Sequence, residues 1–136
     1  MVKEFIWKIR VYYEDTDAGG VIFYANYLRF MERARTEWLR NMGFEHKRLI
    51  DKYKLLFAVK NLTIDYIKPG YLDDLLTVTS KLLDSRGASL IFQQNIKNEN
   101  DELLSQAEIK VACINAKTLK ASPIPEELLM ELTNDS

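Results

Sequence analysis

Cysteine, histidine and long apolar runs are all scarce in this chain of 136 residues. Cys113 is the only cysteine, so no disulfide can form within the chain, and we expect a reducing compartment. The longest stretch without a charged residue, residues 18–28, falls well short of the roughly 20 apolar residues that a membrane helix needs. The first residues also lack the charged-then-apolar layout of a signal peptide. We therefore expect no membrane span and a cytoplasmic location.

The single histidine, His46, restricts the chemistry that the chain can perform. A serine or cysteine triad requires a histidine as its base, and a metal site usually requires several ligands close together. His46 stands alone in a weakly patterned segment, while Cys113 falls on the apolar period of a predicted strand. We therefore expect neither a metal nor a cofactor, and serine or thiol chemistry is disfavoured.

The charge and composition are those of a folded globular protein. The formal net charge is −1, apolar residues make up 47% of the chain and charged residues 29%, and lysine and arginine are spread along it. Because no basic stripe is present to neutralise phosphates, nucleic acid is not an expected partner. No repeat or linker divides the chain, so we predict a single domain over residues 1–136.

Apolar spacing predicts the order of the elements. Alternating apolar residues indicate a strand over residues 5–13, and a polar, glycine-bearing loop follows at residues 14–20. Apolar residues then recur every three or four positions over residues 26–42, which predicts a long amphipathic helix ending at Gly43. The arginines on its other positions are interpreted as a solvated face; they are Arg29, Arg33, Arg35 and Arg40. A weaker pattern predicts a short helix at residues 44–51.

The second half of the chain returns to a period of two. Four alternating segments, centred on residues 62–66, 76–82, 90–96 and 107–113, are separated by short turns, and residues 126–132 can form a final helix. Short turns imply antiparallel hairpins. The long helix is the only large apolar element that can cover one face of such a sheet, so an α+β fold with the helix packed across an antiparallel sheet is predicted.

The loop before the long helix contains the residues best suited to catalysis. Asp17 lies in a glycine-bearing turn that leads into the helix start, and aromatic residues follow at once. The start of a helix presents unpaired N–H groups and a partial positive charge, which can stabilise negative charge on a carbonyl oxygen. A neighbouring carboxylate could attack that carbonyl or activate water.

This region resembles the signature of the 4-hydroxybenzoyl-CoA thioesterase family of hotdog-fold proteins, especially its branch of Tol-Pal-associated acyl-CoA thioesterases. The matching positions are Asp15, Asp17, Gly20, residues 24–27, residues 32–35 and residues 65–70. The resemblance extends over nearly the whole chain. It implies a hotdog fold, in which a five-stranded antiparallel sheet wraps around a long helix, and hydrolysis of acyl-CoA or acyl-carrier-protein thioesters.

The resemblance also assigns roles to individual residues. The catalytic carboxylate falls on Asp17, acting as nucleophile or as general base, and the oxyanion donor falls on the backbone N–H near Tyr24. The Tol-Pal branch usually has histidine at the position of Tyr24, whereas tyrosine there resembles the hydroxybenzoyl branch. This departure removes the imidazole from that position and bears on substrate preference. Substrate contacts are expected from Gly20, Val21, Asn26, Tyr27, Phe57, Val59, Lys60 and Arg86.

The family usually forms dimers or dimers of dimers with active sites between subunits, so a homodimer or homotetramer is expected. Residues 57–60 would then line the acyl pocket from the partner subunit, and Arg86 with Lys60 would contact CoA phosphates.

Other interpretations of the same residues stay open. Asp17 could simply bond to the backbone of its own turn, and Glu14 and Asp15 are interpreted as solvated charges or helix-dipole partners. Core packing explains Tyr27 better than substrate contact does. A non-catalytic adaptor that binds acyl groups, a carrier protein or Tol-Pal components is the alternative function. A hotdog dehydratase would need a suitably placed histidine, and His46 is misplaced for that.

Overall fold

The computed structural model describes residues 3–133. Its strands are β1 (Glu4–Arg10), β2 (Leu55–Tyr66), β3 (Leu75–Arg86), β4 (Ser89–Lys97) and β5 (Leu103–Asn115). Its helices are α1 (Asn26–Asn41), α2 (His46–Arg48) and α3 (Glu126–Thr133), with a 3-10 turn η1 (Tyr13–Asp15) and a π-helical turn η2 (Leu49–Tyr53). The predicted order of elements is confirmed.

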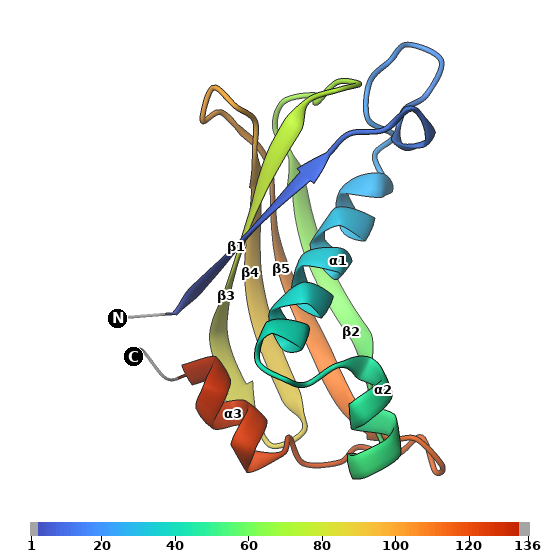
Figure 1. The fold of residues 1–136 in the computed structure, drawn as a ribbon, viewed down its shortest axis with the longest axis vertical. Coiled ribbons are helices and arrows are strands. Elements are labelled where there is room, and N and C mark those ends of the chain that lie inside the picture. The colour runs from blue at the N-terminus through green and yellow to red at the C-terminus, as the bar shows by residue number, and fades with distance from the viewer. Residues whose placement is uncertain (1–2, 134–136) are drawn as a thin grey trace.

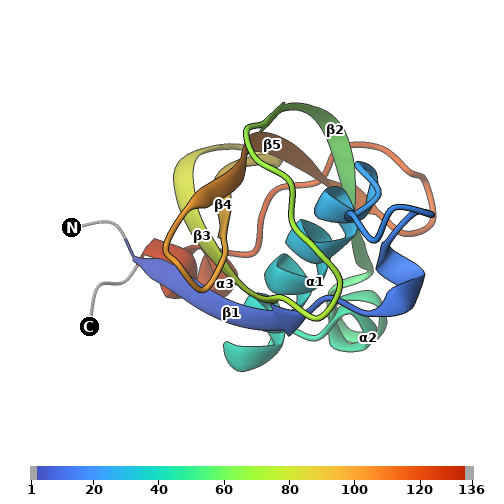
Figure 2. The ribbon, with the colours of Figure 1, turned by 90° about the horizontal axis from the view of Figure 1, so that it is seen from above.

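The five strands form one antiparallel sheet in the order β1-β3-β4-β5-β2. The strands curve around α1, which runs along the concave face of the sheet (Figures 1 and 2). This arrangement confirms the α+β class and the predicted sheet wrapped around a long helix. The inserted α1 also explains the strand order, because the chain crosses from β1 to the far edge at β2 before the hairpins fill the space between them.

The core lies between α1 and the sheet. Phe30, Met31, Ala34 and Trp38 recur at helical spacing and are at most 2% exposed. The Trp38 ring stacks on Phe5 of β1, with ring centroids 5.9 Å apart. Burying a side chain of this size contributes about 1.5–3 kcal/mol, so this one face of α1 supplies much of the stabilisation.

The ends of α1 follow from local sequence. At the C-terminal end, Gly43 adopts a left-handed φ of +85°, and the Phe44 N–H bonds to the Leu39 carbonyl at 2.8 Å. This confirms the predicted glycine cap. The weak helical pattern that follows becomes α2 and η2. The first strand is shorter than predicted: β1 ends at Arg10, and residues 13–15 turn as η1 toward the loop.

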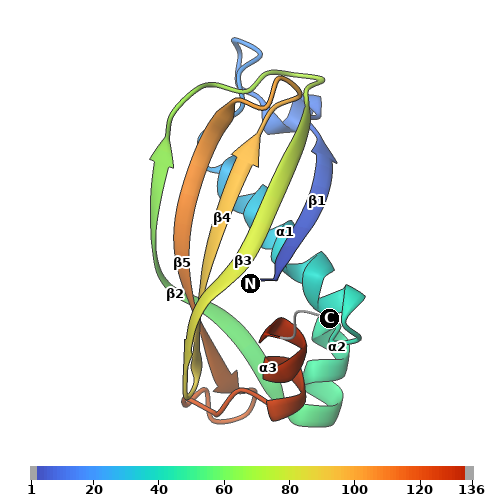
Figure 3. The same ribbon diagram turned by 90° about the vertical axis from the view of Figure 1, so that its left-hand side faces the viewer.

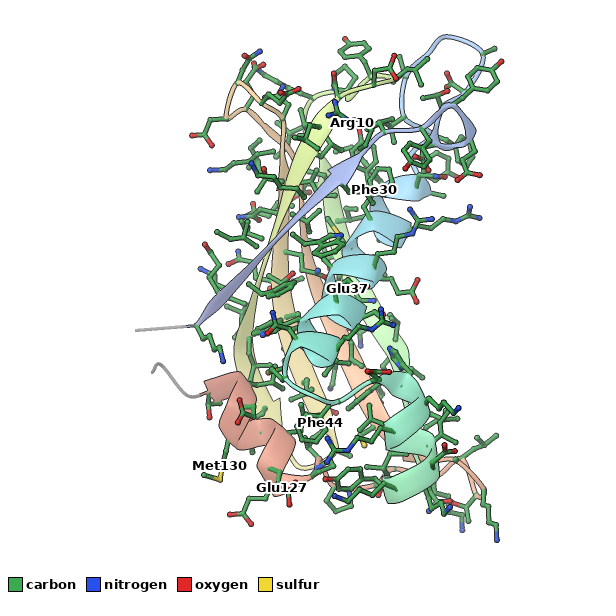
Figure 4. The ribbon with its side chains drawn as sticks, viewed as in Figure 1. Arg10, Phe30, Glu37, Phe44, Glu127 and Met130 are labelled. Atoms are coloured by element: carbon green, nitrogen blue, oxygen red, sulfur yellow. The ribbon has the colours of Figure 1, made fainter. Side chains whose placement is uncertain are left out.

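The two ends of the molecule carry different features. Figure 4 places Arg10 near the loop that precedes α1, and Phe44 at the opposite end with Glu127 and Met130 of α3. The turn between β3 and β4 and the helix α3 also lie at this second end (Figure 3). Within residues 3–133, no helix is long and apolar enough to cross a membrane. Among the described residues, β2 pairs with β5 alone, so its other edge is open in the single chain.

Candidate active site

The loop between β1 and α1 is held in place by backbone hydrogen bonds. Thr16 and Ile22 form an isolated β-bridge, and the Asp17 N–H bonds to the Val21 carbonyl at 3.0 Å. The loop is also attached to the segment before β3, because the Ile22 N–H bonds to the Gly70 carbonyl at 2.9 Å. Gly20 supplies a left-handed φ of +75° at the bend, which a residue with a Cβ adopts only with strain. These contacts give Asp17 a defined position.

The Asp17 carboxylate is exposed at the tip of this loop. Its Oδ1 accepts a hydrogen bond from the Gly19 N–H at 3.0 Å. That bond is the turn contact expected if Asp17 were only a turn residue, and it also orients the carboxylate. A carboxylate accepts several hydrogen bonds, so the contact with Gly19 leaves capacity for water or a reacting group.

The neighbouring Asp15 behaves differently, and the interpretation of it as a solvated charge is wrong. Asp15 is 2% exposed; it accepts hydrogen bonds from the Tyr12 N–H at 2.8 Å and from Asn26 Nδ2 at 2.9 Å. Asn26, the first residue of α1, is itself 5% exposed. The pair therefore connects the loop to the helix start, and the Asn26 amide faces Asp15. Glu14 is exposed, as expected.

The start of α1 is suited to binding negative charge. The Ala25 N-cap cannot supply a capping side chain, and the first turn contains no acidic residue. Within residues 3–133, no group accepts a hydrogen bond from the Tyr24 N–H. This N–H and the helix dipole are thus available to an anionic oxygen of a ligand at the helix start.

Aromatic and apolar residues surround the helix start. A shallow pocket of about 240 Å³ is lined there by Val21, Ile22, Tyr24, Tyr27, Tyr66, Ile67, Lys68 and Pro69. The Tyr24 side chain is 63% exposed and meets the edge of Tyr66, whereas Tyr27 is 4% exposed and its hydroxyl oxygen accepts a bond from the Gly70 N–H at 3.0 Å. Burial raises the pKa of Tyr27, so its hydroxyl stays protonated. Tyr27 packs in the core as expected, and Tyr24 has the free side chain.

The remaining predicted residues lie farther along the chain. Phe57 and Val59 of β2 line a second pocket, of about 270 Å³, between α1 and the sheet. Lys60 is exposed at an irregularity of β2, where the pairing register with β5 shifts. Arg86 is exposed, bonds to Asp84 at 2.9 Å, and ends β3 at the end of the molecule opposite the Asp17 loop (Figure 3). Within one chain, backbone hydrogen bonds join Asp17 to Gly20 and Val21, and Val21 shares the shallow pocket with Tyr24, whereas Arg86 lies apart from them.

A buried polar network beneath α1 was missed by sequence reasoning. Gln94 and Ser80 are fully buried, and Gln94 Nε2 bonds to Ser80 Oγ at 2.8 Å and to the Met31 carbonyl at 2.9 Å. Gln94 Oε1 accepts a bond from the Arg35 guanidinium at 2.7 Å. Arg35 is therefore not part of a solvated face, although Arg29, Arg33 and Arg40 are exposed. The sequence did contain a signal for this network: Ser80 in β3 and Gln94 in β4 are polar residues at positions where the alternating pattern predicts an inward-facing side chain.

The other reactive side chains stay outside this loop. Burial raises the pKa of the Cys113 thiol to about 11, so the reactive thiolate is scarce at neutral pH. His46 lies 3.3 Å from the Thr36 hydroxyl, at the second pocket. Among residues 3–133, no three histidine, cysteine or acidic side chains group closely enough to hold a metal.

Comparison with known proteins agrees with this geometry. Residues 11–132 match the model of a thioesterase-like superfamily. The chain is 45% identical to an acyl-CoA thioesterase, YbgC, of Haemophilus influenzae over 91% of this chain and 90% of that protein. It is 37% identical to the long-chain acyl-CoA thioesterase FadM of Escherichia coli over 79% and 81%. A probable thioesterase from Bartonella henselae superposes with a TM-score of 0.84 at 32% identity, covering 92% of this chain and 100% of that one. The chain therefore belongs to the thioesterase-like superfamily.

Proposed function

We propose that this chain is one thioesterase domain that hydrolyses acyl-CoA thioesters to a free acid and a thiol. One observation supports this above the others: the exposed Asp17 carboxylate is fixed in the loop that leads into a helix start whose Tyr24 N–H has no acceptor among the described residues. Thioester hydrolysis needs a nucleophile or base and a donor for the oxygen that becomes negative, and the loop supplies both kinds of group. The named activities of the relatives belong to the same class.

The reaction can follow either of two routes from this geometry. Asp17 can attack the thioester carbonyl carbon, which expels the CoA thiolate and leaves a mixed anhydride that water then hydrolyses. Alternatively, Asp17 can take a proton from a water molecule that attacks the same carbon directly. In both routes the carbonyl oxygen gains negative charge, and the Tyr24 N–H and the dipole of α1 stabilise it.

A second copy of the chain completes the proposed site. The open edge of β2 carries unpaired backbone groups that can pair with the same edge of another copy around a two-fold axis. Such pairing runs the two α1 helices in opposite directions, so the Asp17 loop of one copy approaches the β2 pocket of the other. In this arrangement Phe57 and Val59 would line the acyl pocket from the partner, and Lys60 and Arg86 would contact CoA phosphates. A homodimer, or a homotetramer built from it, in the cytoplasm fits this scheme, and acyl carrier protein is a second possible thiol donor.

Thiol release from a panel of acyl-CoAs and acyl-carrier-protein thioesters tests the proposal. Asp17→Asn should lower kcat by about 10²–10⁴-fold, since it removes the base or nucleophile while its amide keeps the turn bond. Glu14→Gln is the matched control, because it removes an exposed carboxylate from the same loop, and its activity should stay near that of the unchanged protein.

Two results would contradict the proposal. Near-normal turnover by Asp17→Asn would remove Asp17 from the chemistry. A folded protein that hydrolyses no thioester in the panel would favour the adaptor alternative, and a pull-down with carrier protein would then test that alternative directly.

A further inference from the structure

The pocket beneath α1 combines an apolar wall with a guanidinium that has no ionic partner. Phe57, Leu90 and Phe92 line the sheet side of this pocket of about 270 Å³, and Arg35 lines the helix side. Among residues 3–133, no carboxylate lies within ion-pair distance of Arg35. An apolar substrate alone would not require a cation here.

Arg35 is held in position from below. Gln94, which is fully buried, accepts one Arg35 N–H at 2.7 Å and is itself fixed by Ser80 and the Met31 carbonyl. A guanidinium has five N–H donors, so most of the donors of Arg35 are free for another acceptor. The network thus orients a donor toward the pocket without neutralising its charge.

Arg35 is a partly buried cation whose hydrogen-bond partner among the described residues is a neutral amide. Burial lowers the pKa of Arg35 to about 10, so the side chain stays charged at neutral pH. Glu32 also lines this pocket, and its charge acts on Arg35, but it is exposed and forms no ion pair with Arg35 among the described residues. A partly desolvated cation binds a carboxylate more strongly than a neutral oxygen.

We propose that this pocket receives the far end of the acyl group and that Arg35 binds a carboxylate there, so that the preferred substrates are monothioesters of dicarboxylic acids. This inference rests on the proposed thioesterase function, in which the β2 pocket faces the Asp17 loop of a second copy. Arg35 lies nine positions after Asn26, or roughly 14 Å along the helix axis. The pocket therefore lies away from its own Asp17 loop, where only the partner's loop would reach it.

Matched pairs of acyl-CoAs of equal chain length test the role of Arg35. The pairs are succinyl with butyryl, glutaryl with valeryl, and adipoyl with hexanoyl, and the quantity measured is the ratio of the two kcat/KM values within each pair. Arg35→Met should lower this ratio by about 10- to 100-fold, the effect of one charge-assisted hydrogen bond, by reducing only the rate with the carboxylate-bearing member. Glu32→Gln should raise the ratio, because it removes a negative charge that lines the same pocket and acts on Arg35.

Two further variants separate recognition from structure. Arg40→Met removes an exposed, ion-paired arginine from the same helix and should leave the ratio unchanged. Arg35→Lys keeps the charge and should retain part of the preference, which also keeps the test usable if Arg35→Met does not fold. Thermal unfolding of each variant shows which of them are folded.

Three results would overturn the inference or locate the failure elsewhere. An unchanged ratio in Arg35→Met, or equal loss with both members of a pair, would make Arg35 a structural residue while leaving the proposed hydrolysis intact. Absence of hydrolysis with every thioester would instead contradict the proposed function. In that case, calorimetry can measure the affinities of Asp17→Asn and of the double variant Asp17→Asn with Arg35→Met for glutaryl-CoA and valeryl-CoA. A selective loss of glutaryl-CoA affinity in the double variant would show that Arg35 binds the carboxylate.

Discussion

Replacing Asn26 by aspartate tests whether the contact between Asp15 and Asn26 holds the Asp17 loop on the start of α1. Asn26 Nδ2 donates to Asp15 Oδ1 at 2.9 Å, and both side chains are almost fully buried. Asn26→Asp exchanges this donor for an acceptor. The lost bond to a charged group costs about 1.5–3 kcal/mol. Repulsion between unit charges 4 Å apart adds up to about 4 kcal/mol at an effective dielectric constant of 20.

Uptake of a proton by the pair limits this penalty, so we expect a loss of about 3–6 kcal/mol in the free energy of unfolding at neutral pH. For a domain of this size, that corresponds to a fall of roughly 10–25 °C in Tm. The sign of the pH dependence follows. Repulsion opposes placing two negative charges on the buried pair, so the variant approaches normal stability in acid, where the pair holds a proton, and loses stability as the pH rises.

The double variant Asp15→Asn with Asn26→Asp provides the control. It exchanges the amide and the carboxylate, so residue 15 can still accept from the Tyr12 N–H and can donate to residue 26. We expect it to recover most of the lost stability and of the thioesterase activity. Denaturant unfolding at pH 5 and pH 8 measures both effects. An Asn26→Asp protein that is equally stable at both values, or a double variant no better than the single one, would refute the reasoning.

Two further predictions concern single side chains. Tyr24→Ala should keep kcat within about tenfold while changing KM, because the proposed oxyanion donor is the backbone N–H. In steady-state kinetics, a fall in kcat as large as that of Asp17→Asn would contradict this prediction. For Cys113, burial raises the folded pKa from its ordinary value of 9.0 to about 11. The unfolded thiol therefore ionises first, and stability should fall as the pH rises from about 9 to 11. Cys113→Ala should weaken this loss of stability in unfolding measurements. If the free energy of unfolding falls equally in the variant between these pH values, groups other than Cys113 cause the loss.

Hydrogen bonds between distant segments explain why Asp15 and Asp17 differ. Two positions apart in one polar loop, they look alike by composition. Asp15 accepts hydrogen bonds from the Tyr12 N–H and the Asn26 amide and becomes buried, whereas the Asp17 carboxylate, within the described part of the chain, bonds to its own turn and stays exposed. The environment that a carboxylate meets after folding, rather than its residue type, therefore separates the structural carboxylate, Asp15, from the candidate reactive one, Asp17.

Local pattern by itself determined the elements of this protein and the loop that carries the candidate chemistry. Apolar spacing of three and four residues predicts α1, because one helix face must be buried, and Gly43 marks its end because few other residues adopt a left-handed φ there. Alternation of apolar and polar residues predicts the strands, because successive side chains point to opposite faces of a sheet and only one face is buried. The motif around Asp17 predicts the fold family and the reactive carboxylate.

Only the tertiary structure decided which polar residues are buried together. Arg35, Ser80 and Gln94 are far apart in sequence, and their network forms because α1 crosses β3 and β4 at the level where both strands place a polar side chain inward. Helical periodicity assigned Arg35 to the solvated face, because periodicity shows which face of a helix a residue occupies. It does not show how far a neighbouring sheet covers that face. The pocket between α1 and β2 has the same origin: its walls come from segments that meet only when the sheet curves around the helix.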